Sequence, residues 1–381
     1  IDILTLSEEL DNRNQLEEIG GQVYLMSLIN QTPSSLNAQA YARIVEETSV
    51  RRRMLTAANE MAKLAYQEDK DIESIINSVE QTVFNISERR TKRDLLPIQA
   101  VISEYYDKVS MLSARSDEIF GVPTGLIDLD RLLGGMQKSD LLIVAGRPAS
   151  GKTGFLLTVA KNTAIIHKKH VAIFSLEMSN EQLVQRMIAQ ETNINTQRLR
   201  SGKIEEHEWD SFAQAVEVLS NTKIFLDDTP ALTPFQLRTK CRRMHLEHHI
   251  DLILVDYIQL MSGDTRTENR VQEVSYISRN LKTLARELNV PVLAAAQLSR
   301  AVEQRSDKRP MLSDLRESGS LEQDADVVMF LHKKEDDTAE TDRSQLVELM
   351  VTKHRNGPTK NIELIFLKDL TQFYNAKTVD K

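Results

Sequence analysis

One octapeptide constrains the fold of this 381-residue chain more than any other feature. It reads GRPASGKT and consists of Gly146, Arg147, Pro148, Ala149, Ser150, Gly151, Lys152 and Thr153. An apolar run, Leu141–Ala145, precedes it, and a helical pattern, Lys152–Ala164, follows it. A strand, a glycine-rich loop and a helix in this order predict a P-loop, whose backbone N–H groups and helix N-terminus attract phosphate oxygens. In such a site Lys152 neutralises the β- and γ-phosphates of ATP, and Thr153 binds Mg²⁺.

Apolar runs alternate with helical patterns from Gly121 onwards. Continuous apolar strands between helices are typical of a mostly parallel sheet that helices cover on both faces. The sequence therefore predicts an α/β P-loop domain with such a central sheet, and its last three strands are close enough along the chain to form an antiparallel edge. The expected strands are Leu141–Ala145, Val171–Ser175, Lys223–Leu226, Leu252–Val255, Pro291–Ala296, Val327–Leu331, Leu346–Val351 and Ile362–Leu367.

The first 90 residues contain helical patterns without intervening strands. Apolar side chains recur at helical spacing over Tyr41–Gln67 and Asp71–Ser87, which predicts an antiparallel helical hairpin. Periodicity leaves two roles open for this hairpin, the core of a small domain or a dimerising element, and favours the first. A charged break at 88–94 and Pro97 end the region. An apolar stripe over Ile98–Leu112 then predicts a separate docking helix.

These patterns divide the chain into three parts. Residues 1–90 form an incomplete helical domain, residues 91–117 a linker with the docking helix, and residues 118–381 the ATPase domain. The chain begins with Ile1 rather than Met, which we interpret as the sign of a fragment or a processed form.

The composition excludes several classes of protein. With 41% apolar and 27% charged residues, the chain is typical of globular proteins rather than of disordered tails or collagens. A single cysteine excludes an internal disulfide and a cysteine-rich zinc site. No sequence stretch is long and apolar enough to predict a membrane span. A net charge of −8 argues mildly against nonspecific binding to nucleic acid. It does not exclude such binding, because a ring-shaped protein that encircles a strand needs positive charge only in its central channel.

Three polar residues follow expected strands, where ligands bind in open α/β sheets. Asp256 ends the apolar run DLILVD, which is the Walker B pattern of a carboxylate that holds Mg²⁺ through water. Glu177 follows a second apolar run and is a candidate for the base that activates water. The alternative for Glu177, an acid at the start of a helix before Ser179, has equal weight on spacing alone. Gln297 ends a third run, where an amide can contact the γ-phosphate.

Two segments closer to the C-terminus carry arginines on turns. Arg316 lies in SDLRESGS, a glycine- and serine-rich stretch whose backbone N–H groups suit a nucleic-acid phosphate backbone. Taken alone, that stretch is better explained as solvated surface. Arg355 lies at an Asn-Gly-Pro turn after the strand Leu346–Val351. An arginine on such a turn can reach across a subunit interface as an arginine finger.

Together these motifs make the chain resemble the replicative DnaB-type hexameric DNA helicases of the RecA-like superfamily. Besides the P-loop, the most specific pieces are IFSLEMS, LILVDYIQL, RPMLSDLRESGSLEQDADVVMFL and TKHRNGP. The resemblance covers essentially the whole chain. It implies a RecA-like ATPase domain in a homohexameric ring around single-stranded DNA, with ATP and Mg²⁺ bound between neighbouring subunits and movement from 5′ to 3′.

The resemblance also implies roles for individual residues. Glu177 matches the catalytic carboxylate, and Gln297 matches the residue that links the nucleotide to DNA. The residues that act in trans on the neighbour's γ-phosphate match Lys353 and Arg355. The loop that binds the DNA backbone inside the ring matches Arg316, Glu317 and Gly319.

Partners and location follow from the same resemblance. The helix Ile98–Leu112 looks like the linker helix that docks on the adjacent subunit. The hairpin Tyr41–Ser87 looks like the collar element that pairs subunits and contacts primase, and a helicase loader is a further expected partner. The implied location is cytoplasmic and nucleoid-associated, of the bacterial or phage type. Most of the globular subdomain that precedes a segment like Ile1–Gly21 in this family is missing, which predicts an N-terminally truncated member.

Two alternatives share parts of this pattern. A RecA- or RadA-like recombination ATPase has the same P-loop and the lead-in at Leu129–Gly135. The helical N-terminal hairpin and linker helix favour the helicase. An ATP-gated assembly scaffold that does not unwind DNA is the second alternative. The presence of Glu177, Gln297 and Arg355 argues against it.

Overall fold

In the computed structural model the chain forms two compact units, residues 1–110 and 111–381. The structure describes residues 3–13, 15–31, 38–67, 97–113, 119–264, 269–299, 302–303, 308–333 and 343–376, together with 305, 307 and isolated positions between 72 and 83. None of the helices in these segments combines the length and apolarity that a bilayer-spanning helix needs.

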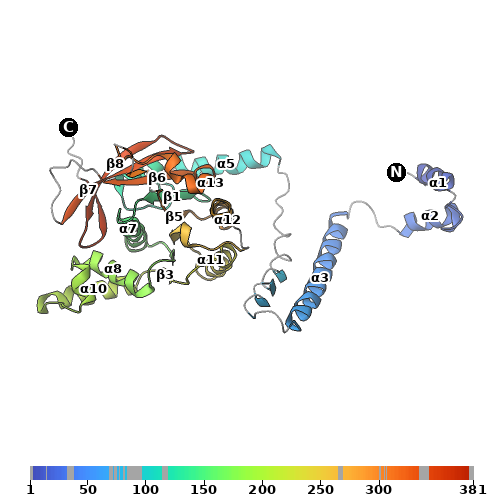
Figure 1. Ribbon diagram of the computed structural model, residues 1–381. Coiled ribbons are helices and arrows are strands. Elements are labelled where there is room, and N and C mark those ends of the chain that lie inside the picture. The colour runs from blue at the N-terminus through green and yellow to red at the C-terminus, as the bar shows by residue number, and fades with distance from the viewer. Residues whose placement is uncertain are drawn as a thin grey trace. The chain divides into compact units, whose positions relative to one another are not determined.

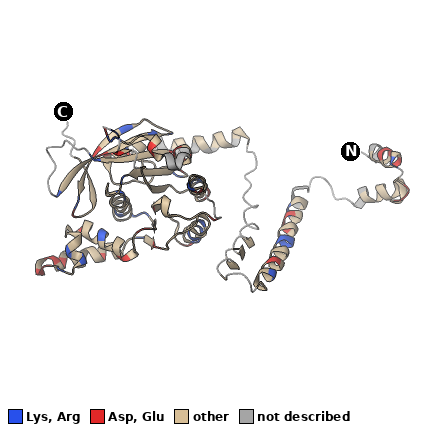
Figure 2. Cartoon of the chain, viewed as in Figure 1, with Lys and Arg blue, Asp and Glu red and all other residues tan. Residues whose placement is uncertain are grey.

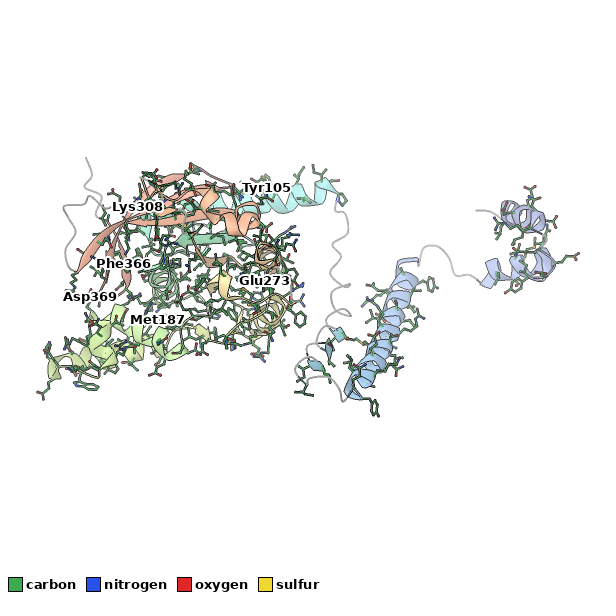
Figure 3. The ribbon with its side chains drawn as sticks, viewed as in Figure 1. Tyr105, Met187, Glu273, Lys308, Phe366 and Asp369 are labelled. Carbon is green, nitrogen blue, oxygen red and sulfur yellow. The ribbon has the colours of Figure 1, made fainter. Side chains whose placement is uncertain are left out.

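The first unit is helical. It contains α1 (Ile3–Asn12), α2 (Gly21–Gln31), α3 (Ala38–Ala65) and most of α5 (Ile98–Ser113). Charges of both signs are distributed along α3 (Figure 2). The predicted helices Tyr41–Gln67 and Ile98–Leu112 correspond to α3 and α5, whereas most of the second hairpin helix, Asp71–Ser87, lies outside the described residues. The side chain of Tyr105 extends from α5 and is exposed (Figure 3).

The second unit is built on a nine-stranded sheet with the order β3-β2-β4-β5-β1-β6-β7-β8-β9 (Figure 1). The pairs from β3 through β6 are parallel, and those from β6 through β9 are antiparallel. The strands are β1 (Leu141–Gly146), β2 (Val171–Ser175), β3 (Ile224–Asp227), β4 (Leu252–Asp256), β5 (Val292–Gln297), β6 (Val327–Lys333), β7 (Ser344–His354), β8 (Lys360–Leu367) and β9 (Gln372–Asn375).

The predicted fold class is confirmed by this architecture. Each of the eight predicted strands is present within a few residues of its expected bounds, and the predicted antiparallel edge is formed by β6, β7 and β8. The sequence analysis missed β9, because Gln372–Asn375 is short and half polar and so lacks the apolar run that marks the other strands.

Helices cover both faces of the sheet, and each face has its own apolar core (Figure 1). Leu142 and Val144 of β1 face the core that includes α6, α7 and α8, while Ile143 faces the core that includes α11 and α12. All six residues of β1 are therefore buried. The helices are α6 (Ile127–Leu133), α7 (Lys152–Ile165), α8 (Asn180–Thr192), α9 (Thr196–Arg200), α10 (Trp209–Ser220), α11 (Pro234–His248), α12 (Arg270–Leu288) and α13 (Gly319–Asp324), with 3₁₀ turns η3 (Glu206–Glu208), η4 (Ile258–Leu260) and η6 (Leu312–Ser318).

Candidate functional site

The P-loop joins the buried strand β1 to α7 and folds back over its own lysine. Lys152 Nζ donates hydrogen bonds to the carbonyl oxygens of Gly146 (3.0 Å) and Arg147 (3.1 Å). Gly151 has a φ of 93°, and a Cβ there would lie 2.9 Å from the ring of Phe373. The loop conformation therefore requires glycine at this position.

Burial is the main influence on the pKa of Lys152. It lowers that pKa, because an apolar environment disfavours the charged amine. The nearby carboxylates of Asp256 and Glu177 act in the opposite direction, whereas the charge of Arg147 lowers the pKa further. A phosphate group placed in the loop would favour the charged amine in the same way as the carboxylates do.

Asp256 lies at the end of β4, where it meets the first residues of α7. Its Oδ2 accepts a hydrogen bond from Thr153 Oγ1 at 2.6 Å, while its buried Oδ1 has no hydrogen-bond partner among the described residues. Burial raises the pKa of Asp256, and the Thr153 hydroxyl and the charge of Lys152 oppose this rise. A buried carboxylate oxygen without a partner beside a threonine hydroxyl fits a divalent cation with oxygen ligands.

Glu177 follows β2 at the same sheet edge. Strand pairing sets Ser175 of β2 opposite Asp256 of β4, so Glu177 lies just beyond that pair. The side chain of Glu177 is exposed. Ser179, two residues beyond Glu177, caps α8 and forms a reciprocal capping box with Gln182.

Gln297 stands beside the P-loop at the end of β5. The register of β1 and β5 pairs it directly with Gly146. The side-chain amide of Gln259, on η4, forms two hydrogen bonds with the backbone of Gln297. Its Nε2 donates to the Gln297 carbonyl (3.1 Å), and its Oε1 accepts from the Gln297 N–H (3.1 Å). The sequence analysis quoted Gln259 within LILVDYIQL but gave it no role.

Arg186 is a second residue that the sequence analysis missed. It lies on α8, and burial lowers its pKa while the charges of Asp256 and Glu177 raise it. The arginine is therefore part of the same electrostatic cluster as the two carboxylates. A signal was available in the sequence, namely a cation in the helix that follows the strand and turn carrying Glu177.

Arg147 connects the P-loop to the segment that follows β5. Its Nη1 donates to the carbonyl of Leu298 (3.0 Å), and its Nη2 forms an ion pair with Glu303 (2.6 Å). A cavity of about 440 Å³ lies beside this contact, between the P-loop and the end of β6 at Leu331. Arg147 of the P-loop is therefore in direct contact with the segment beyond β5.

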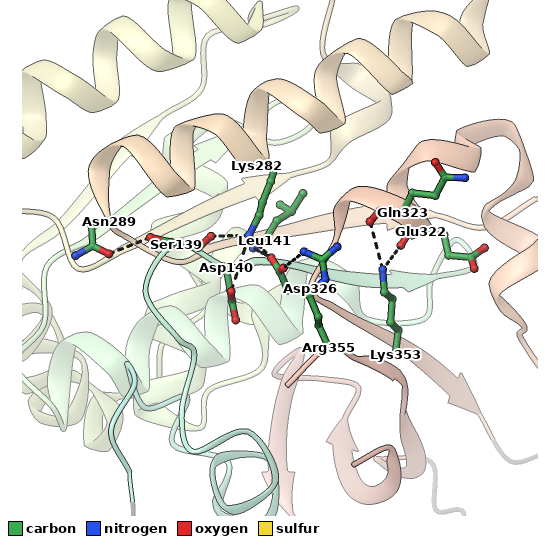
Figure 4. Close-up of polar contacts among 10 residues, drawn as sticks. All are labelled: Ser139, Asp140, Leu141, Lys282, Asn289, Glu322, Gln323, Asp326, Lys353 and Arg355. Carbon is green, nitrogen blue, oxygen red and sulfur yellow. Dashed lines mark hydrogen bonds and ion pairs between the residues drawn. The ribbon is translucent and has the colours of Figure 1, made fainter. Parts of the chain in front are cut away.

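Arg355 and Lys353 lie near Asp326, at the end of the sheet where β1 and β6 begin (Figure 4). Arg355 binds Asp326, which precedes β6 and pairs through its backbone with Leu141 at the start of β1. The P-loop begins at the other end of β1, about 17 Å away at the usual rise of a strand. The structure thus brings Lys152, Thr153, Glu177, Asp256 and Gln297 together and separates Lys353 and Arg355 from them.

The predicted DNA loop begins in η6 and continues into α13. The backbone of this segment, including Gly319, is described, whereas the side chains of Arg316 and Glu317 are not. Asp314 ties the segment to the end of β5, since its carbonyl accepts from Ser299 N–H (3.2 Å) and its Oδ2 accepts from Met311 N–H (2.7 Å).

Comparisons with known proteins show which family the chain is similar to. Residues 121–375 match the family described as DnaB-like helicase C terminal domain, and residues 1–47 match DnaB-like helicase N terminal domain. The chain is 45% identical over 378 residues to the replicative DNA helicase DnaC of Bacillus subtilis and 46% identical to the replicative DNA helicase DnaB of Geobacillus stearothermophilus. Each alignment covers 99% of this chain and 83% of the relative.

Two solved structures are similar to the whole chain or to its second unit. A DnaB-like replicative helicase, studied with its interactions with primase, has a TM-score of 0.78 and 30% identity over 99% of this chain and 88% of that one. A second solved structure, an isolated ATPase domain, has a TM-score of 0.70 and 35% identity over 74% of this chain and 100% of that one. These matches confirm the predicted RecA-like fold and the prediction of an ATP-dependent helicase. They support neither the recombination ATPase nor the assembly scaffold. The chain belongs to the DnaB-like family of replicative DNA helicases.

Proposed function

We propose that the chain hydrolyses ATP with Mg²⁺ at the interfaces of a homohexameric ring, and that this hydrolysis moves the ring along single-stranded DNA. One observation carries the proposal. Lys152 and Arg355 lie at opposite ends of the strands of one sheet, so a single subunit cannot place both on the same nucleotide. A head-to-tail arrangement of subunits brings one end of each against the other end of its neighbour.

The P-loop end supplies the half-site that binds the nucleotide. Backbone N–H groups of the P-loop and Lys152 bind the phosphates. Thr153 and Asp256 are the residues that would hold Mg²⁺, and the ion would neutralise charge on the phosphates. Glu177 orients the attacking water and accepts its proton. Arg186 interacts electrostatically with both carboxylates and adds positive charge to this half-site.

The opposite end supplies the second half-site. The side chain of Arg355 is 54% exposed, so part of it is accessible to a group outside its own subunit. In the ring, Arg355 and Lys353 approach the γ-phosphate bound by the neighbouring subunit and stabilise the charge that develops during transfer. An arginine finger of this kind contributes roughly 10³ to 10⁵ in rate.

Coupling to DNA follows from the contacts around β5. Gln297 lies beside Gly146, and Arg147 holds the segment after β5 through Leu298 and Glu303. Movement at the P-loop therefore shifts the segment that leads to Arg316, Glu317 and Gly319. These residues bind the phosphate backbone, which makes the movement tolerant of DNA sequence.

The proposed partners extend the same interpretation. The first unit pairs subunits through its helices and contacts primase, as supported by the similarity to a DnaB-like helicase studied with primase. A helicase loader is the other proposed partner, and the proposed location is cytoplasmic and nucleoid-associated. The division at residues 90 and 117 is retained as the proposed domain organisation.

Subunit mixing tests the shared site. Arg355→Ala and Lys152→Ala should each lose at least about 10³ in DNA-stimulated ATP turnover, because each lacks one half of the site. Mixed in equal amounts, they should regain turnover, since about a quarter of the interfaces in a randomly mixed ring combine two intact halves. The measurement is ATP turnover with single-stranded DNA against mixing ratio.

Arg131→Ala is a matched control. Arg131 is also an exposed arginine, but it pairs only weakly with Asp128 on α6, and its removal should leave turnover unchanged. Full turnover by Arg355→Ala alone would contradict the trans role. Turnover that stays at the level of the single variants at every ratio would count against a site made by two subunits.

A further inference from the structure

Arg355 is attached to one residue, Asp326, by two separate contacts, one to its carboxylate and one to its backbone carbonyl. Its Nη1 pairs with Asp326 Oδ1 at 3.1 Å, and its backbone N–H donates to the Asp326 carbonyl at 2.8 Å (Figure 4). The two contacts fix both the start and the end of the arginine side chain. A long side chain with several rotatable bonds is thereby restricted before any nucleotide arrives.

Asp326 is itself held by two other elements of the fold. Its Oδ2 accepts the N–H of Leu141 at 2.9 Å and also binds Lys282 of α12, and its N–H donates to the Leu141 carbonyl at 2.9 Å. Only 3% of the Asp326 side chain is exposed. A carboxylate fixed in this way, between the central strand and a covering helix, is a rigid support.

Asp326 lies in a cluster of charges of both signs. Asp140 is a second carboxylate of this cluster, 3.9 Å from Lys282 Nζ, and Lys353 interacts electrostatically with both Asp326 and Arg355. Because Asp326 has Lys282 as well, it does not depend on Arg355 alone for its compensation. The exposed part of Arg355 can then bind a second anion without leaving Asp326 unpaired.

We propose that Asp326 is a positioning residue for hydrolysis, which holds the Arg355 guanidinium at this end of the sheet in the geometry needed for the neighbouring subunit's γ-phosphate. This inference rests on the proposed trans role of Arg355. Lys353 contributes to the same end, where its Nζ donates to the carbonyl of Glu322. Pre-ordering of the arginine lowers the entropy lost when the transition state forms.

The kinetic consequence is specific. Loss of the Asp326 charge leaves the P-loop half-site intact, so the KM for ATP should change by less than about twofold. The kcat should fall about tenfold, because the arginine must be ordered during each turnover. A purely structural role would lower the thermal stability without this division between kcat and KM.

The first experiment compares Asp326→Asn with Asp140→Asn. Asp326→Asn should show the fall in kcat, whereas Asp140→Asn, which alters a carboxylate of the same cluster that does not contact Arg355, should keep kcat within about twofold. Adding Asp326→Asn to Arg355→Ala should cause no further loss, because Asp326 acts through Arg355. Additive losses in the double variant would overturn the inference.

Subunit mixing then shows whether the loss of kcat in Asp326→Asn belongs to the half-site that carries Arg355. Asp326→Asn subunits keep an intact P-loop, so mixing them with Lys152→Ala subunits should restore turnover to the extent seen for Arg355→Ala with the same partner. Restoration by Arg355→Ala but not by Asp326→Asn would refute the positioning role. If Asp326→Asn fails to assemble, Asp326→Glu, which keeps the charge and displaces it by one methylene, replaces it; full kcat in that variant would equally refute the role.

The outcomes separate this inference from the function on which it rests. Normal turnover by Arg355→Ala would remove the trans finger itself. A large loss in Arg355→Ala together with normal turnover in Asp326→Asn would leave the shared site in place and reject Asp326 as its support.

Discussion

Asp256 and Glu177 are two carboxylates at one sheet edge with different surroundings. Asp256 is buried at the end of β4 with one oxygen on Thr153, whereas Glu177 is exposed beyond β2. A buried carboxylate beside a hydroxyl suits an ion, and an accessible one suits a water molecule and its proton. Their environments therefore separate the two roles that their residue types leave open.

Glu177→Gln tests this division at the residue level. The variant should bind ATP with unchanged affinity, because the P-loop contacts remain. Its turnover should fall by about 10² to 10⁴, the usual contribution of a general base. Equilibrium binding of a fluorescent ATP analogue and steady-state turnover measure the two effects. Turnover close to that of the parent would exclude Glu177 as the base.

Motif residues were predictable because each is fixed by a local pattern. Lys152, Thr153 and Asp256 follow from a strand, a loop and a spacing that can be read from the sequence alone. Gln259 and Asp326 were assigned no role, since each acts through a contact with a residue distant in the sequence. Such roles are decided by tertiary packing, which periodicity does not encode.

At the level of elements, the start of β1 concentrates buried charge. Asp140 directly precedes the strand, and burial together with the charge of Asp326 raises the pKa of Asp140 to about 6, against the pull of Lys282 and Arg355. The ionised form of Asp140 is therefore less favoured in the folded protein than in the unfolded chain. Stability is lost as the pH rises through the interval between the ordinary and the raised pKa.

Asp140→Asn should remove this dependence. At about pH 7 the variant should gain about 1 to 2 kcal/mol in the free energy of unfolding of the second unit, because solvent screening reduces the full value of the pKa shift. The gain should vanish near pH 4. At that pH the Asp140 carboxyl of the parent is largely protonated in the folded state, and the pH is close to the ordinary pKa that the carboxyl has in the unfolded chain. Denaturant unfolding at the two pH values measures it. An equal difference between variant and parent at both pH values would show that Asp140 titrates normally.

Eight strands of the sheet were predictable because each contains an apolar run, and β9 was missed because it contains none. Fully buried strands are continuous apolar runs, and β1, β2 and β4 are buried at every position. The strand β9 lies at the sheet edge with the sequence QFYN, in which only the pairing with β8 reveals a strand. Strand order likewise required the structure, because it depends on crossovers between distant segments.

At the level of the whole molecule, the second unit has two chemically different ends. One carries the P-loop with its associated carboxylates, and the other carries Arg355 on the support of Asp326. In the proposed shared site, each end supplies one half. Subunits that associate through these ends are necessarily oriented in the same direction around a ring.

Dilution should therefore reduce activity per subunit. If the site is shared, specific ATP turnover with single-stranded DNA should fall together with the mass of the assembly, because each dissociated interface removes a complete site. Light scattering and turnover on the same samples, with and without ATP and Mg²⁺, measure both. A monomer with undiminished turnover would contradict the ring.

The separation of Arg355 from Lys152 along β1 also determines what a gap in such a ring looks like. A closed ring has as many working sites as subunits, and the same ring opened at one interface has one fewer. The break exposes a P-loop without a finger on one side and a finger without a nucleotide on the other. Opening the proposed ring to admit a DNA strand would thus lower the number of complete ATPase sites by one, and ATP turnover would fall accordingly.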